Sequence, residues 1–227
     1  MTPSAAGCWP AVLFYGDAGG IRPAMVDMAQ LLAEAGYVVL LPDPFYRFGP
    51  YEPLVPVEVF KGDVMAILGP LIATTSNRKA AEDVGAFINF LDSTGLVKGM
   101  KMGAVGFCMG GGMAITGAAT EPTRFAAVAS FHGGNLATDD TTSPHRVVCD
   151  LDAAVLVVCA ESDPTSPPAM IARLEDSLIN AGVEFDVQTY AGAVHGWMVP
   201  DFPAYDPANA ERGWKSLLGF FHSKLDV

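Results

Sequence analysis

The sequence predicts an α/β fold in which a single domain, residues 1–227, is built on a mostly parallel sheet with helices on both faces. Short apolar runs alternate with longer segments of helical period, which is typical of βαβ units. Hydrophobic residues make up 51% of the chain and charged residues only 17%, so much of the chain should be buried, as in a sheet covered on both faces. A length of 227 residues suits one α/β domain.

The predicted strands are short apolar runs bounded by glycine, proline or acidic turns. In chain order they occupy residues 11–15, 37–43 and 102–107 and the apolar parts of residues 125–134, 151–164 and 184–197. Together they predict a sheet of about six strands, because each crossover between parallel neighbours needs a helical segment and the chain supplies these.

Segments with apolar residues at helical spacing separate most of these strands. The first, residues 22–36, has Pro23 in its first turn and Gly36 where the helix should stop. The others are residues 61–74, 79–95, a segment that begins after Cys108, 168–182 and 206–225. The stretches 43–60, 135–150 and 196–206 are polar or proline-rich, and such long irregular loops are often binding loops.

Composition and charge exclude several classes of partner. The chain has 13 basic and 25 acidic residues and a formal charge of -12, which is unfavourable for binding nucleic acid. The N-terminus lacks the basic and apolar regions of a secretory signal, and no apolar run approaches the ~18 residues of a membrane span. We therefore expect a cytoplasmic protein, a monomer or homodimer, with no membrane contact and no nucleic acid partner.

Cys108 stands in a motif that singles it out among the four cysteines. Residues 106–110, "GFCMG", follow a predicted strand and have the G-x-nucleophile-x-G spacing of a nucleophile elbow, a tight turn from strand to helix. The partial positive charge of the following helix N-terminus favours a thiolate there. A lone cysteine in an apolar strand, such as Cys159, is more often a packing residue, and a Walker-type phosphate loop would need a lysine that "GGGMA" lacks.

An elbow cysteine needs a base, and the base needs an acceptor that orients it. Asp163 ends one predicted strand and His195 follows the last one, so both should reach the sheet edge where Cys108 lies. Glu161 competes for the acid role and His132, at another strand end, for the role of base. Aspartate is typical of such turns, which favours Asp163 over Glu161. Only His195 follows the acid in the order nucleophile, acid, histidine, which favours it over His132.

With "GFCMGG", "ESD" and "AVHGW" in this order, the chain resembles the dienelactone hydrolase family of α/β hydrolases from about residue 10 to its end. The segments "VVLLPDPFYR" and "ASFHGG" extend the similarity. The resemblance implies an α/β-hydrolase fold, Cys108 as nucleophile, His195 as base and Asp163 as its orienting acid. It also implies an oxyanion hole formed by the backbone N–H groups of Met109 and Ala18.

The chain departs from the family pattern at three places. The family glutamate that modulates the cysteine is replaced by Asp17, whose carboxylate has a shorter reach. Arg47 matches one of two arginines that hold a substrate carboxylate, but "HGWMVP", after the histidine, offers no second arginine. Ten residues before the first strand are too few for the antiparallel strand pair of the family, so these strands should be reduced or missing.

These observations predict a hydrolase that cleaves an ester or lactone of a small, partly hydrophobic substrate, with or without an anionic group, through a cysteinyl acyl-enzyme and with no metal and no cofactor. The residues expected near the substrate are Arg47, Tyr46, Phe48, Trp197 and Arg22. Two alternatives stay open: a carboxylesterase or thioesterase of broad specificity, and a ligand-binding protein that keeps the hydrolase scaffold without activity.

Overall fold

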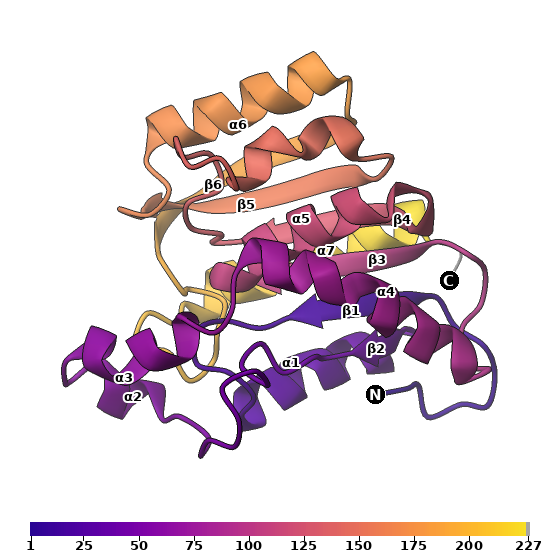
Figure 1. Ribbon diagram of the computed structural model, residues 1–227, viewed down its shortest axis with the longest axis horizontal. Coiled ribbons are helices and arrows are strands. Elements are labelled where there is room, and N and C mark those ends of the chain that lie inside the picture. Colours follow the sequence, from indigo (N-terminus) through magenta and orange to yellow (C-terminus); the bar gives the residue numbers. More distant parts are fainter. Residues whose placement is uncertain (226–227) are drawn as a thin grey trace.

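A twisted, six-stranded parallel sheet forms the centre of the protein in the computed structural model, which describes residues 1–225. The strand order is β2-β1-β3-β4-β5-β6, and every neighbouring pair is parallel (Figure 1). The strands are β1 (Ala11–Tyr15), β2 (Val38–Leu40), β3 (Met102–Phe107), β4 (Phe125–Phe131), β5 (Ala154–Ser162) and β6 (Phe185–Val194). The predicted fold class is confirmed within this described part, which contains no antiparallel strand pair; residues 226–227 of the predicted domain lie outside it.

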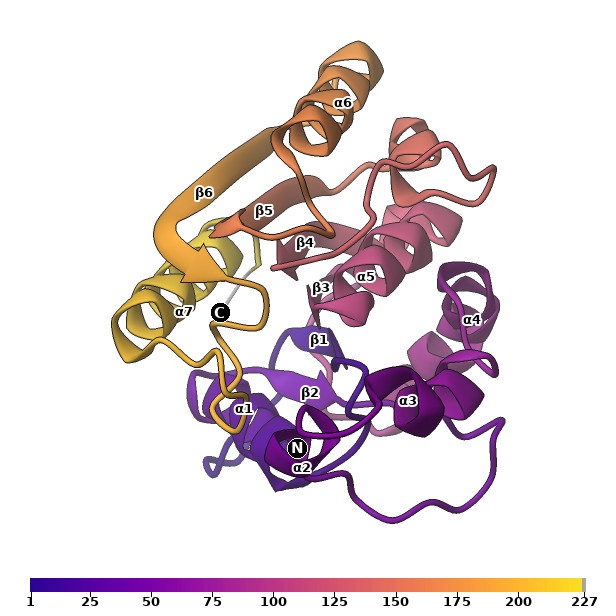
Figure 2. The ribbon, with the colours of Figure 1, turned by 90° about the vertical axis from the view of Figure 1, so that its left-hand side faces the viewer.

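Helices cover both faces of the sheet (Figure 2). One face carries α1 (Pro23–Glu34) and α7 (Pro207–Lys224), and the other carries α4 (Asn77–Ser93), α5 (Met109–Thr120) and α6 (Pro168–Ala181). Each face therefore has its own apolar core. β1, β3 and β4 are almost wholly buried, which explains why these strands read as continuous apolar runs rather than as alternating ones.

The segment between β2 and α4 differs from the expectation of a long irregular loop over residues 43–60. It contains a short helix, α2 (Pro56–Val59), followed by α3 (Val64–Ile72). Pro56 occupies the first turn of α2, where its missing N–H costs nothing, and the Asp63 side chain caps α3 by accepting from the Met65 and Ala66 N–H groups. Both helices project beyond the body of the sheet (Figure 1). We call residues 54–72 the cap segment.

The described helices include none with the length and apolar character that a membrane crossing requires. Most of the apolar residues are instead used in the two layers of core between sheet and helices.

Candidate active site

Cys108 lies at the turn between β3 and α5, and its backbone is held in a rare conformation. Its φ is 55° and its ψ is -118°, which non-glycine residues seldom adopt and which marks a functional position more often than a structural one. The turn is possible because its neighbours lack side chains. A Cβ at Gly106 would collide with the carbonyl of Gly110, and one at Gly110 would collide with the backbone at Tyr15.

Three side chains from three different strand ends meet at this turn. His195 Nε2 lies 3.0 Å from Cys108 Sγ, and His195 Nδ1 lies 2.6 Å from Asp163 Oδ2. Both Cys108 and His195 are partly accessible, whereas the Asp163 carboxylate is buried. This chain of contacts has the geometry of a nucleophile, its base and the acid that orients the base.

Thr165 completes the surroundings of Asp163, and the sequence interpretation did not include it. Its Oγ1 donates to Asp163 Oδ1 at 2.7 Å and its backbone N–H donates to the same oxygen at 2.8 Å. The signal was present in "DPTS", because an aspartate followed two residues later by threonine is typical of an Asx turn. Glu161 is committed elsewhere, since its carboxylate accepts from the Gly192 N–H.

The electrostatics of the site favour an imidazolium. Burial alone would lower the pKa of His195, but the hydrogen bonds to Asp163 and Cys108 outweigh burial and raise it from 6.5 to about 10. Burial would likewise raise the pKa of Asp163, yet its hydrogen bonds to His195 and Thr165 lower it. At neutral pH the site thus holds a carboxylate and a cationic ring beside the sulfur.

Replacing Cys108 by alanine should therefore lower the pKa of His195. The variant loses the hydrogen bond to Sγ and the electrostatic interaction with Cys108, which are two of the contributions that raise this pKa, while the Asp163 hydrogen bond stays. A pH titration of the His195 ring by NMR, in the wild type and in Cys108→Ala, measures the change directly. An unchanged titration would contradict the contact between the ring and the sulfur.

His132, the alternative base, lies beside His195 but makes no hydrogen bond to the sulfur. It is fully buried, and neither ring nitrogen has a hydrogen-bond partner among the described residues. Its ring packs edge-on against His195, with 5.4 Å between ring centroids. Burial, and then the charge of His195, lower its pKa from 6.5 to about 3, so the ring is neutral at physiological pH.

We expect His132→Asn to change kcat/KM for an ester by less than about tenfold, because the buried ring is a weak base and neither of its nitrogens contacts a reacting group. Asparagine also tolerates the positive φ of 39° at this position.

His132→Asn should also make the free energy of unfolding less dependent on pH on the acid side. In the wild type the unfolded chain binds a proton at His132 below about pH 6.5 and the folded chain does not until about pH 3, so stability falls as pH falls through this window. Urea unfolding of the wild type and the variant between pH 3 and pH 6.5 tests this dependence of stability on pH. For the activity, a loss of kcat/KM as large as that of a His195 variant would transfer the role of base to His132.

The oxyanion-hole candidates lie at the ends of two neighbouring strands. Met109 is the first residue of α5, directly after Cys108, and Ala18 lies in the loop after β1. Ala18 also lines the cavity above Cys108. Both residues therefore lie close in the fold to Cys108, and their role as a pair of backbone donors stays a prediction of the family resemblance.

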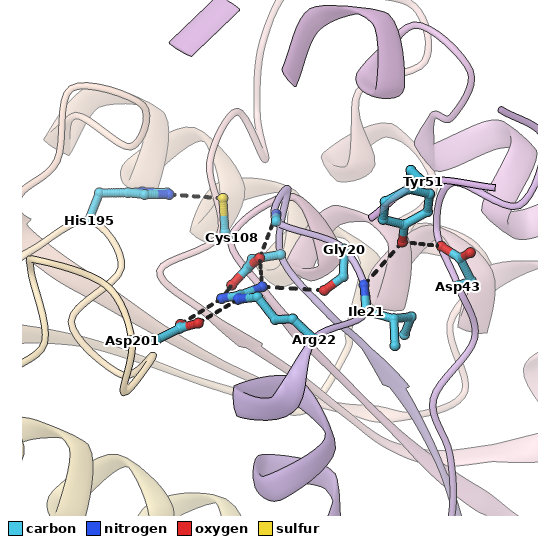
Figure 3. A network of polar contacts seen from close by, with 10 residues as sticks. Gly20, Ile21, Arg22, Asp43, Tyr51, Cys108, His195 and Asp201 are labelled. Atoms are coloured by element: carbon cyan, nitrogen blue, oxygen red, sulfur yellow. Dashed lines mark hydrogen bonds and ion pairs between the residues drawn. The ribbon is translucent and has the colours of Figure 1, made fainter. Parts of the chain in front are cut away.

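Arg22 and Asp17 are engaged with each other. The Arg22 guanidinium donates to both carboxylate oxygens of Asp17 at 2.7 and 2.8 Å, and both side chains are almost fully buried. Its other edge donates to both oxygens of Asp201 at 2.7 and 2.8 Å, as Figure 3 shows. Asp17 also accepts from the Gly19 N–H, so the network fixes the loop that carries Ala18. Sequence reasoning had no signal for Asp201, because its contact spans 179 positions of the chain.

The remaining residues expected near the substrate lie away from the sulfur's cavity. Arg47 forms a two-pronged ion pair with Asp83 and its guanidinium lies 4.5 Å from the Tyr46 ring centroid; these three residues line a separate cavity. Phe48 is exposed. Trp197 is fully buried in the core against the sheet and α7, so its indole does not reach the mouth of the site.

A cavity of about 160 Å³ opens directly above the sulfur. Its walls come from the loop after β1, the cap segment and the loop after β6. The lining residues are Ala18, Gly19, Leu54, Pro56, Val59, Phe60, Leu68, Cys108, His195 and Phe202. Four of the cap-segment residues lie in the stretch 43–60 and Phe202 lies in the stretch 196–206, both of which the sequence suggests as binding loops. The individual lining residues were not predicted, because an apolar run in a proline-rich stretch does not reveal which part of the fold it covers.

The sheet order, the elbow and the convergence of strand-end side chains define the α/β-hydrolase class. The chain belongs to the dienelactone hydrolase family, whose profile matches residues 1–225, and the resemblance noted in the sequence is confirmed. A Methylorubrum extorquens protein provisionally named carboxymethylenebutenolidase is 28% identical over 223 residues, which cover 96% of this chain and 74% of that protein. A Bradyrhizobium protein provisionally named 2-oxo-3-(5-oxofuran-2-ylidene)propanoate lactonase is 26% identical over 220 residues, covering 95% and 84%.

The fold is also that of solved relatives. A crystal structure from Klebsiella pneumoniae, provisionally described as a dienelactone hydrolase, superposes with a TM-score of 0.85 at 21% identity, covering 97% of this chain and 90% of that one. This protein is therefore a member of a hydrolase family with the family's fold.

Proposed function

We propose that this protein hydrolyses the ester or lactone bond of a small molecule, with Cys108 as nucleophile. The observation that carries the proposal is the unbroken contact from Cys108 Sγ through His195 to the buried Asp163. The lactone-cleaving names of the relatives support the reaction class. Cys159 offers no alternative nucleophile, because burial raises its pKa from 9.0 to about 11.

The reaction begins with attack of the Cys108 thiolate on the substrate carbonyl carbon. The carbonyl oxygen gains the negative charge, and the N–H groups of Met109 and Ala18 stabilise it. The C–O bond to the leaving alkoxide then breaks as His195 donates its proton to that oxygen, which leaves a thioester on Cys108. In a lactone the alcohol formed stays attached to the acyl group.

Water completes the cycle. His195, now neutral, accepts a proton from a water molecule as the water oxygen attacks the thioester carbon. The C–S bond then breaks, which releases the carboxylic acid and the Cys108 thiolate. Asp163 keeps the ring oriented throughout, since it holds Nδ1 while Nε2 faces the sulfur. The chemistry requires no metal or organic cofactor. We also propose that the protein is cytoplasmic and acts as a monomer or a homodimer.

Trapping the acyl-enzyme tests this mechanism. After rapid mixing with p-nitrophenyl acetate and acid quenching, peptide mass spectrometry should find the acetyl group on Cys108. The exposed Cys8 and Cys149 serve as internal controls and should carry little label. An acetyl group confined to another residue, with turnover intact, would contradict the assignment.

This trapping experiment, together with turnover assays on a panel of lactones, esters and thioesters, separates the alternatives. A broad carboxylesterase or thioesterase would form the adduct and turn over thioesters and unstrained esters as well as lactones. A ligand-binding protein without activity would show no burst of p-nitrophenol and no adduct.

A further inference from the structure

The cavity above Cys108 has an almost wholly apolar lining. Two of its ten lining residues are Cys108 and His195. The other eight are alanine, glycine or residues with larger aliphatic or aromatic side chains. His195 is already shared between Asp163 and the sulfur. Among the residues that the structure describes, the cavity wall contains no lysine and no arginine.

The two arginines expected to hold an anionic group are committed to carboxylates. Arg22 has Asp17 on one edge and Asp201 on the other, and its side chain is 1% exposed. Arg47 is paired with Asp83 in a different cavity. A substrate carboxylate in the cavity over Cys108 would lose its hydration without gaining a cationic partner, which is strongly unfavourable. The formal charge of -12 also repels anions from the protein as a whole.

The volume and the rim give further information about the occupant. A dry cavity of about 150 Å³ lined by leucine, isoleucine and phenylalanine accommodates benzene, so 160 Å³ is enough for a short aliphatic chain or one ring. Phe60 of the cap segment and Phe202 of the loop after β6 meet edge to face across the rim, with 5.3 Å between centroids. The cap segment continues this apolar character outward, because Val55, Phe60 and Met65 are 58%, 48% and 65% exposed.

We propose that the site selects an uncharged, apolar acyl group of short-chain or single-ring size, bound between the cap segment and the Ala18 loop. The proposal rests on the proposed hydrolase function; it keeps the partly hydrophobic substrate expected from sequence and removes the anionic group. Val59 is a specificity-determining residue in this arrangement, since it is buried, lines the cavity and lies on the short helix α2.

The test compares p-nitrophenyl butanoate with p-nitrophenyl hydrogen succinate, which differ mainly by a terminal carboxylate. We expect kcat/KM for the butanoate to exceed that for the succinate by more than about tenfold, since desolvating an unpaired carboxylate costs more than ~1.4 kcal/mol. Val59→Arg, which places a cation in the wall, should move the ratio toward the succinate by more than tenfold. Val57→Arg is the matched control, because Val57 lies on the same helix but is exposed and lines a different cavity; its ratio should stay as in the wild type.

A second variant guards against misfolding of Val59→Arg. Val59→Ala enlarges the cavity and should raise the ratio of hexanoate to acetate ester turnover. Equal or better turnover of the succinate by the wild type, or ratios that no Val59 variant changes, would overturn the proposal while leaving the hydrolase function intact. Failure of the wild type to hydrolyse any ester or lactone would instead overturn the proposed function, and this inference with it.

Discussion

Cys108→Ala and His195→Asn are each expected to lower kcat/KM for an activated aryl ester by at least about a thousandfold. The first removes the atom that attacks the carbonyl carbon, and the second removes the group that protonates the leaving oxygen and activates water. Because the two side chains act as one unit at 3.0 Å, the double variant should be little worse than either single one. Initial rates under kcat/KM conditions, corrected for spontaneous hydrolysis, measure the effect.

The controls separate chemistry from folding. Cys149→Ser changes an exposed thiol away from the site and should keep wild-type rates. Thermal unfolding of each variant should show that the fold survives, since Cys108 is partly accessible and contributes little core packing. Retention of more than about a tenth of the activity by Cys108→Ala would show that another group is the nucleophile, because loss of a nucleophile has far larger effects.

The positions of Cys108, Asp163 and His195 could be predicted because each follows an apolar run that marks a strand. Apolar runs fixed where β3, β5 and β6 end, and parallel strands place those ends at one edge of the sheet. Cys108, Asp163 and His195 could therefore be expected together before any coordinates. The choice of Asp163 over Glu161 depended on the preference of aspartate for such turns, and the structure brings Asp163 and not Glu161 to the ring.

The surroundings of the site were much less predictable, because they depend on contacts between segments distant in sequence. Arg22 and Trp197 illustrate this. Both are close in sequence to residues of the site. The Arg22 guanidinium is enclosed by two carboxylates, however, and the Trp197 side chain turns into the core after Gly196, whose φ is 89°. The cap segment forms a wall of the cavity, although the sequence predicts irregular structure for its first part, up to residue 60, and a helix only from residue 61. Local patterns describe each element, whereas side-chain orientation in loops is decided by the partners that the fold supplies.

Arg22→Met should destabilise the folded protein by about 3–5 kcal/mol, because it leaves the carboxylate of Asp17 buried without its charge partner. The Asp17 side chain is 0% exposed and can recover neither water nor another cation without a rearrangement of the loop after β1. The double variant Asp17→Asn/Arg22→Met should recover much of the loss, since no buried charge then remains unpaired. Urea unfolding at neutral pH measures both values, and a loss below about 1 kcal/mol in Arg22→Met would mean that the pair contributes no more than a surface ion pair.

Asp201→Asn provides the milder change that links this network to catalysis. The Asp201 side chain is 32% exposed, so its loss should cost little stability while loosening the Arg22 guanidinium that holds Asp17. Asp17 accepts from the Gly19 N–H, next to the proposed oxyanion donor Ala18. A donor displaced by a fraction of an ångström is expected to matter more in the transition state than in the ground state, so kcat should fall several-fold while KM changes little. An altered KM with an unchanged kcat would instead indicate that the Arg22 network acts on substrate binding, and not on the geometry of the oxyanion hole.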